Sequence, residues 1–293
     1  MAVRPAHSPE ERCARRAERR ARQRERNASR AEAMHRARVA FAAADRPVAG
    51  DHARAHNVGC SGWFYWHWRG SFYPADSRPE TWFGHYAARF DTVELNAPFY
   101  SWPTVATVKS WLRQCAGRPF VFTVKVNELI THTRRFEGTA RLVRDIGHVA
   151  DLLGPHMGCL LFQLPPGFDY APERLAAIVS QLEPGRRNVV EFRHPSWWRE
   201  EVYEAFRAAG IVFCSCSGPG LPDEVIRTAD DVYLRFHGTT RWYRHDYGPE
   251  ELALWAARVR ACAPARVWAY FNNDREAHAV KNADAFLRLL EDG

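Results

Sequence analysis

The chain has 293 residues, 46% of them hydrophobic, which is enough to form one large α/β domain or two ordinary domains. No stretch approaches the roughly 18 consecutive apolar residues that cross a bilayer, and the N-terminus lacks the apolar core of a secretory signal, so we expect no membrane partner and a cytoplasmic location. The seven cysteines are scattered without a C-x-x-C pair, which argues against a disulfide framework or zinc ribbon and favours packed, reduced thiols.

The net charge of +7 is confined to the N-terminal segment. Residues 1–56 contain 14 Arg and 7 acidic side chains, whereas the rest of the chain is balanced. The stretch "ERCARRAERRARQRERNASRAEAMHRARVAF" has almost no large apolar side chains, so we expect a solvated helix or a flexible arm with little to bury. Such an arm could bind nucleic acid through its phosphates; the alternatives are an idle extension or a natural start at Met34.

Eight short runs of β-forming residues follow one another from residue 57 on. Most are separated by stretches with helical apolar periodicity, such as "EELALWAARVRAC" at 250–262. This alternation implies a parallel sheet, and eight repeats at this length predict one (β/α)8 TIM-type barrel over residues 57–293, after the basic extension 1–56. The predicted strands are "NVGCS" (57–61), "TVELNAPF" (92–99), "FVFTVKVN" (120–127), "GCLLFQLP" (158–165), "NVVEFRH" (188–194), "IVFCSCS" (211–217), "DVYLRFHG" (231–238) and "VWAYFNND" (267–274).

The connections between these runs weaken the case for a nucleotide-binding fold. No G-x-G-x-x-G or P-loop follows any predicted strand. The segment after the sixth strand, "GPGLPDEVIRTAD", is too short and too rich in Pro and Gly for a full helix, so we expect a loop there.

Side-chain alternation identifies the residues that face the barrel interior. Because the apolar set of each strand packs against the helices, the opposite set points into the lumen. Catalytic groups of such barrels gather at the carboxyl ends of the strands, and the inward residues near those ends are mostly polar here. The inward set is predicted to be Glu94, Asn96, Thr123, Lys125, Asn127, Leu161, Gln163, Val189, Glu191, Arg193, Tyr233, Arg235, His237, Trp268, Tyr270 and Asn272.

Charges inside a barrel require partners, and two interpretations remain open. The first is a self-satisfied ion network, in which Glu94 pairs with Lys125. Glu191 would pair with Arg235 in the same network. The second is a binding site, because well-packed apolar residues are usually as stable as buried ion pairs. The excess of cations, Lys125, Arg193 and Arg235, over the two carboxylates favours a phosphate or carboxylate ligand.

The loops after the first and third strands add aromatic and basic side chains. "SGWFYWHWRGSFYP" (61–74) holds Trp63 among several aromatics, and "ITHTRR" (130–135) holds His132 and Arg134. Aromatic faces beside arginines can stack on rings and bind phosphates. The alternative is that the tryptophans only seal the barrel mouth.

These motifs, taken in order, resemble the YecE-like proteins, the family known as domain of unknown function 72. The resemblance spans about residues 58–290 and rests on "VGCSGWFY", "TVELNAPFY", "FTVKVNELITHTRR", "LLFQLPPGF", "VEFRHPSWW", "VYLRFHG" and "YFNND". It implies a TIM barrel and no established biochemical role. One departure is Ser217, in "FCSCSGPG", at a position where relatives commonly carry an Asp; any mechanism that needs an acid there is in doubt.

The leading hypothesis is an enzyme, a hydrolase, isomerase or lyase, that acts on an anionic, phosphorylated or nucleic-acid-derived substrate at the mouth. Glu94 or Glu191 would act as the base. His237 or His132 would act as the acid. The predicted ligand-binding residues are Asn96, Lys125, Gln163, Arg193, Arg235, Asn272, Asn273, Trp63 and Arg134.

No cofactor is predicted, and a catalytic metal is not favoured. Suitable ligand types occur at Glu94, Glu191, His194, His237 and Asp274, but none has the close spacing of known metal motifs, and the inward cations would repel a divalent ion. The rival hypothesis is a non-catalytic module that binds a nucleotide, nucleic acid or phosphorylated metabolite, with affinity added by the arm. Substrate identity and oligomeric state stay open under both hypotheses.

Overall fold

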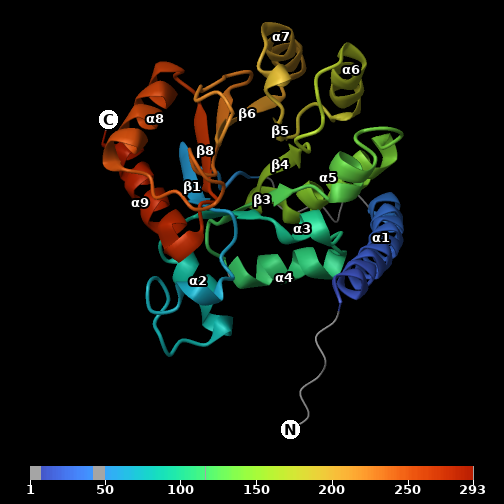
Figure 1. The fold of residues 1–293 in the computed structure, drawn as a ribbon, viewed down its shortest axis with the longest axis horizontal. Coiled ribbons are helices and arrows are strands. Elements are labelled where there is room, and N and C mark those ends of the chain that lie inside the picture. The colour runs from blue at the N-terminus through green and yellow to red at the C-terminus, as the bar shows by residue number, and fades with distance from the viewer. Residues whose placement is uncertain (1–7, 42–49, 116, 293) are drawn as a thin grey trace.

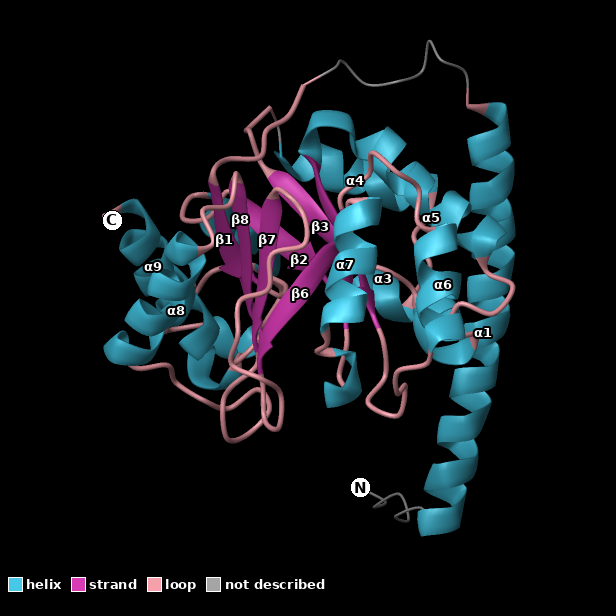
Figure 2. Ribbon diagram, turned by 90° about the horizontal axis from the view of Figure 1, so that it is seen from above, coloured by secondary structure: helices cyan, strands magenta, loops and turns pink. Residues whose placement is uncertain are grey.

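A computed structural model describes residues 8–41, 50–115 and 117–292 of the chain. Figure 1 shows helices arranged around a central group of strands, and Figure 2 shows the same strands from above. No helix within the described ranges is long and apolar enough to span a membrane.

The described residues form eight parallel strands in the order β1-β8-β7-β6-β5-β4-β3-β2, which confirms the predicted TIM-type barrel. Each strand is followed by a helix except β6, whose connection to β7 is a loop, as its Pro and Gly content predicted. The strands are β1 His56–Cys60, β2 Thr92–Leu95, β3 Val121–Lys125, β4 Met157–Gln163, β5 Asn188–Glu191, β6 Val212–Ser217, β7 Asp231–Phe236 and β8 Arg266–Phe271. The helices are α1 Pro9–Ala40, α2 Trp82–Ala87, α3 Ala97–Tyr100, α4 Val105–Cys115, α5 Ala140–Leu153, α6 Pro172–Gln181, α7 Glu200–Ala209, α8 Pro249–Ala261 and α9 His278–Glu291.

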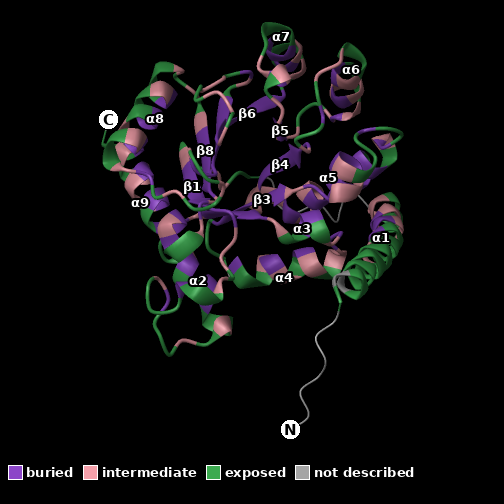
Figure 3. Cartoon of the chain, in the orientation of Figure 1, coloured by how far each residue is buried: buried purple, intermediate pink, exposed green. Residues whose placement is uncertain are grey.

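Two buried layers result from the alternation of side chains along the strands. The larger layer lies between strands and helices and includes Val190, Phe192 and Leu234. The second layer lies in the lumen and holds predicted inward residues. Its members are Val121, Cys159, Leu161, Val189, Val212, Cys214, Cys216, Tyr233, Trp268 and Tyr270. The strands at the centre of Figure 3 are largely purple, the colour of buried residues.

The basic extension is partly docked. Helix α1 begins at a capping box, in which Ser8 and Glu11 satisfy each other's backbone N–H groups. Its C-terminal half packs along α5, where Ala31 and Met34 are buried. The expectation of an arm with little to bury was wrong for this half of the helix, because Ala31 and Met34 are buried and polar side chains add further contacts to the barrel. These contacts are Asn27 with Tyr100 O, Glu32 with Arg141, and His35 and Arg38 with Asp145.

The barrel has a seam between β1 and β2, where the hydrogen-bonded ladder of the described strands is interrupted. Gly59 lets the two backbones approach, since a Cβ atom there would lie 2.4 Å from Thr92 O. The buried Tyr86 hydroxyl bridges the seam: it accepts from Cys60 N at 2.8 Å and donates to Thr92 O at 2.9 Å. One side chain thus replaces two ladder contacts.

Replacing Tyr86 with phenylalanine is expected to lower the free energy of unfolding by about 1–3 kcal/mol, because one buried N–H and one buried C=O lose their partner. The measurement is urea unfolding. Tyr243→Phe serves as the control, since Tyr243 is 46% exposed and its hydroxyl can be replaced by water contacts. Equal stabilities for the two variants would contradict the bridging role.

Candidate functional site at the barrel mouth

A buried guanidinium connects two carboxylates at the carboxyl end of the barrel. Arg235 of β7 donates through Nη2 to Glu94 Oε1 at 2.6 Å and through Nη1 to Glu191 Oε2 at 2.5 Å. Glu94 comes from β2 and Glu191 from β5, so the guanidinium spans the lumen. Tyr233 and Ser61 also donate to Glu94, at 2.6 and 2.8 Å. All these side chains are buried, which makes the pairing energetically necessary.

A second arginine closes the network toward the rim. Arg193 Nε donates to Glu191 Oε1, and its Nη2 lies 2.9 Å from His237 Nε2. The indole ring of Trp242 covers this guanidinium, with 4.4 Å from Cζ to the ring centroid. Asn272 Nδ2 lies 3.3 Å from His237 Nδ1 on the other side of the imidazole. The imidazole is therefore held on both of its nitrogens.

These contacts determine the protonation of the two central groups. Burial by itself would raise the pKa of Glu191, but Arg193 and Arg235 hold that pKa well below its usual range. Burial, followed by the charges of the same two arginines, keeps the pKa of His237 well below its usual range. At neutral pH Glu191 is an anion and His237 is neutral, so neither exchanges protons readily near pH 7.

Lys125 lies at the end of β3 without a carboxylate partner among the described residues. The predicted pairing of Glu94 with Lys125 was wrong, because the Glu94 carboxylate accepts hydrogen bonds from Arg235, Tyr233 and Ser61 instead. The amine instead lies over the Phe99 ring, 4.0 Å from its centroid. Burial lowers the pKa of Lys125 to about 7, with a further contribution from the charge of Arg235. The amine is therefore poised to gain or lose a proton at neutral pH.

His132 packs edge-on against the same Phe99 ring, with centroids 4.8 Å apart. Its Nδ1 lies 2.9 Å from Thr131 Oγ1 within the π-helical turn Leu129–Thr133. Burial lowers the pKa of His132 to about 4, and the charge of Lys125 adds to the effect. The acid role predicted for this histidine stays a prediction, and at pH 7 the ring is neutral.

Two buried polar atoms near the network lack a hydrogen-bond partner among the described residues: Asn96 Oδ1 and Arg235 Nε. Asn96 uses its amide to donate to Ser61 O at 3.1 Å. Gln163, the neighbour of Glu191 in the β4–β5 register, donates to Leu164 O. A buried acceptor and a buried donor without protein partners are consistent with a polar ligand or ordered water.

Three predicted ligand-binding residues lie outside this network. Asn273 donates to His245 O and to Asn282 Oδ1 of α9, so its amide serves the packing of the last helix. Trp63 packs edge-on against Phe83 of α2, at 5.3 Å between centroids. Arg134 is exposed on the loop after β3. Their ligand-binding roles stay predictions.

Sequence reasoning left several neighbours of the network out of the predicted site. Tyr233 was placed inward but given no role, and Ser61 lay at the edge of its predicted strand. Trp242 lies in the irregular segment after β7, where no periodicity indicates direction. The signal for Tyr233 was available: a buried tyrosine hydroxyl needs a partner, and Glu94 has the same inward parity.

One group of possible metal ligands occurs among the described residues. Single ligand atoms of Glu191, Cys216 and His237 lie within 4.8 Å of one another, all buried. Arg193 and Arg235 already occupy the Glu191 carboxylate, and both would repel a divalent cation. The prediction that a metal is not favoured stays a prediction.

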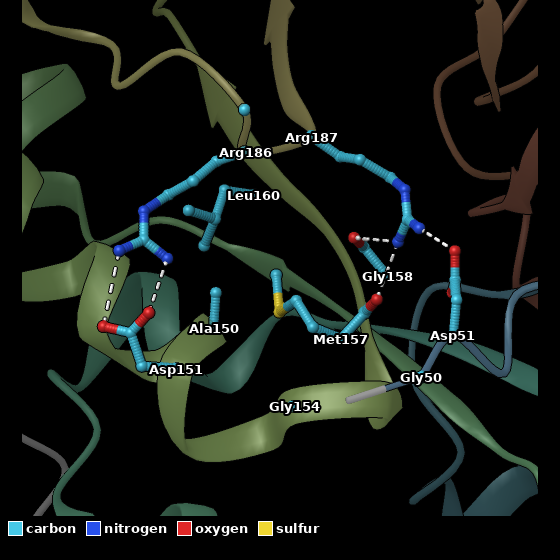
Figure 4. A pocket seen from close by; sticks show the side chains of 11 residues that line it. Gly50, Asp51, Ala150, Asp151, Gly154, Met157, Gly158, Leu160, Arg186 and Arg187 are labelled. Atoms are coloured by element: carbon cyan, nitrogen blue, oxygen red, sulfur yellow. Dashed lines mark hydrogen bonds and ion pairs between the residues drawn. The ribbon is translucent and has the colours of Figure 1, made fainter. Parts of the chain in front are cut away.

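A cavity lies at the opposite, amino end of the strands. Its volume is about 250 Å³, and Figure 4 shows Arg186 and Arg187 on its wall. Arg186 contacts both carboxylate oxygens of Asp151, at 3.1 and 3.3 Å, and Arg187 binds Asp51. These cations are already paired, and the amino end of such barrels usually serves stability.

The fold and the buried network around Arg235 define a TIM-barrel protein with its candidate site at the carboxyl ends of the strands. The model of the family described as "Protein of unknown function DUF72" matches residues 57–293, and the chain belongs to this family. The resemblance noted from the motifs is thereby confirmed.

Individual relatives agree with this assignment. The UPF0759 protein YunF of Bacillus subtilis (strain 168) is 26% identical over 273 residues, which cover 80% of this chain and 94% of that protein. A crystal structure of a DUF72 family protein from Thermotoga maritima MSB8 superposes with a TM-score of 0.74 at 29% identity, covering 81% of this chain and all of that one. A DUF72 family protein from Enterococcus faecalis V583, at 17% identity and a TM-score of 0.69, shares the fold over 80% of this chain and 95% of its own.

Proposed function

We propose that the chain is an enzyme that binds a small anionic substrate at the carboxyl-end mouth of the barrel and performs acid–base chemistry on it. The observation that carries the proposal is Lys125. It is a mostly buried amine without a carboxylate partner among the described residues, directly beside a network whose other charges are paired. An anion bound there would supply the missing counter-charge.

These contacts suggest catalytic roles that differ from the mechanism predicted from the sequence, in which Glu94 or Glu191 acts as the base. Glu191 and Glu94 are held by Arg235 and keep that guanidinium in place, so a positioning role fits them best. Lys125 has a pKa of about 7 and is the group suited to proton exchange at neutral pH. Asn96 Oδ1 and Arg235 Nε offer an acceptor and a donor for orienting a polar substrate. Isomerisation, elimination and hydrolysis all fit such a set.

The test measures anion binding to the full chain as a gain in stability, by thermal unfolding at pH 6 and pH 8. Sulfate is the probe, because its charge does not change over this range. A ligand at ~100 times its dissociation constant adds ~2.7 kcal/mol to the stability of the folded state. We expect stabilisation that is stronger at pH 6, where Lys125 is protonated, and that is absent in Lys125→Met.

The matched control is Lys281→Met, which removes a lysine that is 72% exposed at its side chain and is paired with Asp246. This variant should respond to sulfate like the natural chain. Equal sulfate responses of Lys125→Met and the natural chain would refute an anion site at Lys125. Ribose 5-phosphate and inorganic phosphate, tested in the same way, would indicate whether a phosphorylated substrate is preferred.

A second candidate function, nucleic-acid binding without turnover, is favoured by the surface around the mouth. Four exposed aromatics, Phe64, Trp66, Tyr100 and Tyr243, lie in the segments that follow β1, β2 and β7, with Tyr100 at the end of α3. Helix α1 is anchored to Tyr100 O through Asn27, and its Arg-rich first half is exposed. A single-stranded oligonucleotide that binds with a steep salt dependence, retained in Lys125→Met, would support this function over the enzyme.

A further inference from the structure

We propose that the Lys125 amine forms a reversible imine with the carbonyl group of an anionic aldehyde or ketone. This inference rests on the proposed function and narrows its substrate class to carbonyl compounds that carry a carboxylate or phosphate. In the step, the lone pair of the neutral amine attacks the carbonyl carbon and forms a C–N bond. The carbonyl oxygen takes up the two amine protons and leaves as water, so no oxidant, reductant or further reactant is needed.

The first support is the environment of the amine. A buried lysine normally pairs with a carboxylate, yet Glu94 and Glu191 bind Arg235, and Glu191 also binds Arg193. Among the described residues, the direct contact given for the Lys125 amine is the face of Phe99, and no carboxylate pairs with it. A cation–π contact attracts the protonated amine but does not occupy the lone pair of the neutral amine, which stays free to attack a carbonyl carbon.

The second support is the choice of residue type. The chain contains 41 Lys and Arg residues, and only Lys109, Lys125 and Lys281 among them are lysines. Arginine provides a permanent charge and cannot act as a nucleophile in a protein, whereas lysine can. Within the part of the chain that the structure describes, Lys125 is the lumen cation without an ion pair, whereas Arg193 and Arg235 both have ion pairs. Charge alone would not require lysine at this position.

The third support is reactivity at neutral pH. Burial lowers the pKa of Lys125 to about 7, so about half of the amine is nucleophilic at pH 7, whereas an ordinary lysine with a pKa of about 10.4 is almost entirely protonated. The His132 ring, which is neutral at pH 7, packs against the same Phe99.

The experiment is reductive trapping of the full chain with sodium cyanoborohydride at pH 7. The aldehydes are glyoxylate, which carries a carboxylate, glycolaldehyde phosphate, which carries a phosphate, and uncharged glycolaldehyde. Peptide mass spectrometry locates the reduced adduct and separates it from the N-terminal amine. Labelling of Lys281 in the same molecules corrects for the intrinsic reactivity of each aldehyde.

We expect Lys125 to be labelled at least about tenfold faster than Lys281, given the difference in neutral amine. After this correction, at least one of the two anionic aldehydes should label Lys125 faster than glycolaldehyde does. The faster of the two anionic aldehydes shows whether the site prefers a carboxylate or a phosphate. Lys109→Arg/Lys281→Arg should keep the labelling, and Lys125→Arg should lose it. Labelling of Lys125 no faster than that of Lys281 would overturn the imine. If sulfate still stabilised the fold in that case, the anion site would stand and only the imine would fall.

Discussion

Replacing Arg235 with methionine is expected to lower the free energy of unfolding by about 3–5 kcal/mol, as urea unfolding would measure. The substitution removes the partner of two buried carboxylates, and an uncompensated buried charge costs far more than the net value of an ion pair. Arg193 remains on Glu191, but Glu94 keeps only the hydroxyl groups of Tyr233 and Ser61.

A double variant separates this cause from loss of packing. Glu94→Gln/Arg235→Met removes the carboxylate charge that Arg235→Met leaves unpaired and keeps the Glu191–Arg193 pair, so it should recover most of the lost stability. The surface control is Arg207→Met, whose partner Glu200 lies at 2.6 Å but whose side chain is 48% exposed; a loss of about 0–1 kcal/mol is expected. If Arg235→Met matched the surface variant, the lumen charges would have to be hydrated or neutralised.

Replacing Lys125 with methionine is expected to raise stability at pH 6 relative to the natural chain, and this gain should shrink as pH rises. The pKa of Lys125 is about 7 in the folded protein and about 10.4 in the unfolded chain, so the unfolded state binds more protons between these values. The natural chain therefore gains stability with rising pH, at about 1.4 kcal/mol per pH unit between pH 8 and pH 9. Methionine has no such dependence.

The measurement is urea unfolding of both proteins at pH 6, 7, 8 and 9. Only the difference between them is interpreted, because the other titrating groups are common to both. The control is Lys281→Met, which replaces a lysine whose side chain is 72% exposed. A constant difference for Lys125→Met would show that its amine has the same affinity for protons in the folded and unfolded states.

The barrel and its inward residues were predictable because both depend on local patterns. Alternation along each strand placed Glu94, Glu191 and Arg235 in the lumen, where the structure has them. The partners were not predictable, since parity gives the face of a strand but not the height or direction of a long side chain. Glu94 therefore binds Arg235 of distant β7 instead of Lys125 on neighbouring β3.

The docking of α1 could not be predicted from composition. Its contact with the barrel depends on Met34 and Ala31 and on polar groups such as Asn27, which make no recognisable apolar stripe. The low pKa of Lys125 was equally hidden, because it results from burial and then from the charge of Arg235. Such effects require the three-dimensional arrangement.

The lumen contacts make the two parts of the barrel dependent on each other. Strands β5 and β6 share only a short ladder, Val189 with Val212 and Val190 with Phe213, and the seam lies on the far side. A chain cut between α7 and β6 would place both carboxylates on one fragment and Arg235 on the other. Neither fragment could bury its charges alone, so the two pieces should acquire structure only when mixed, by fragment complementation.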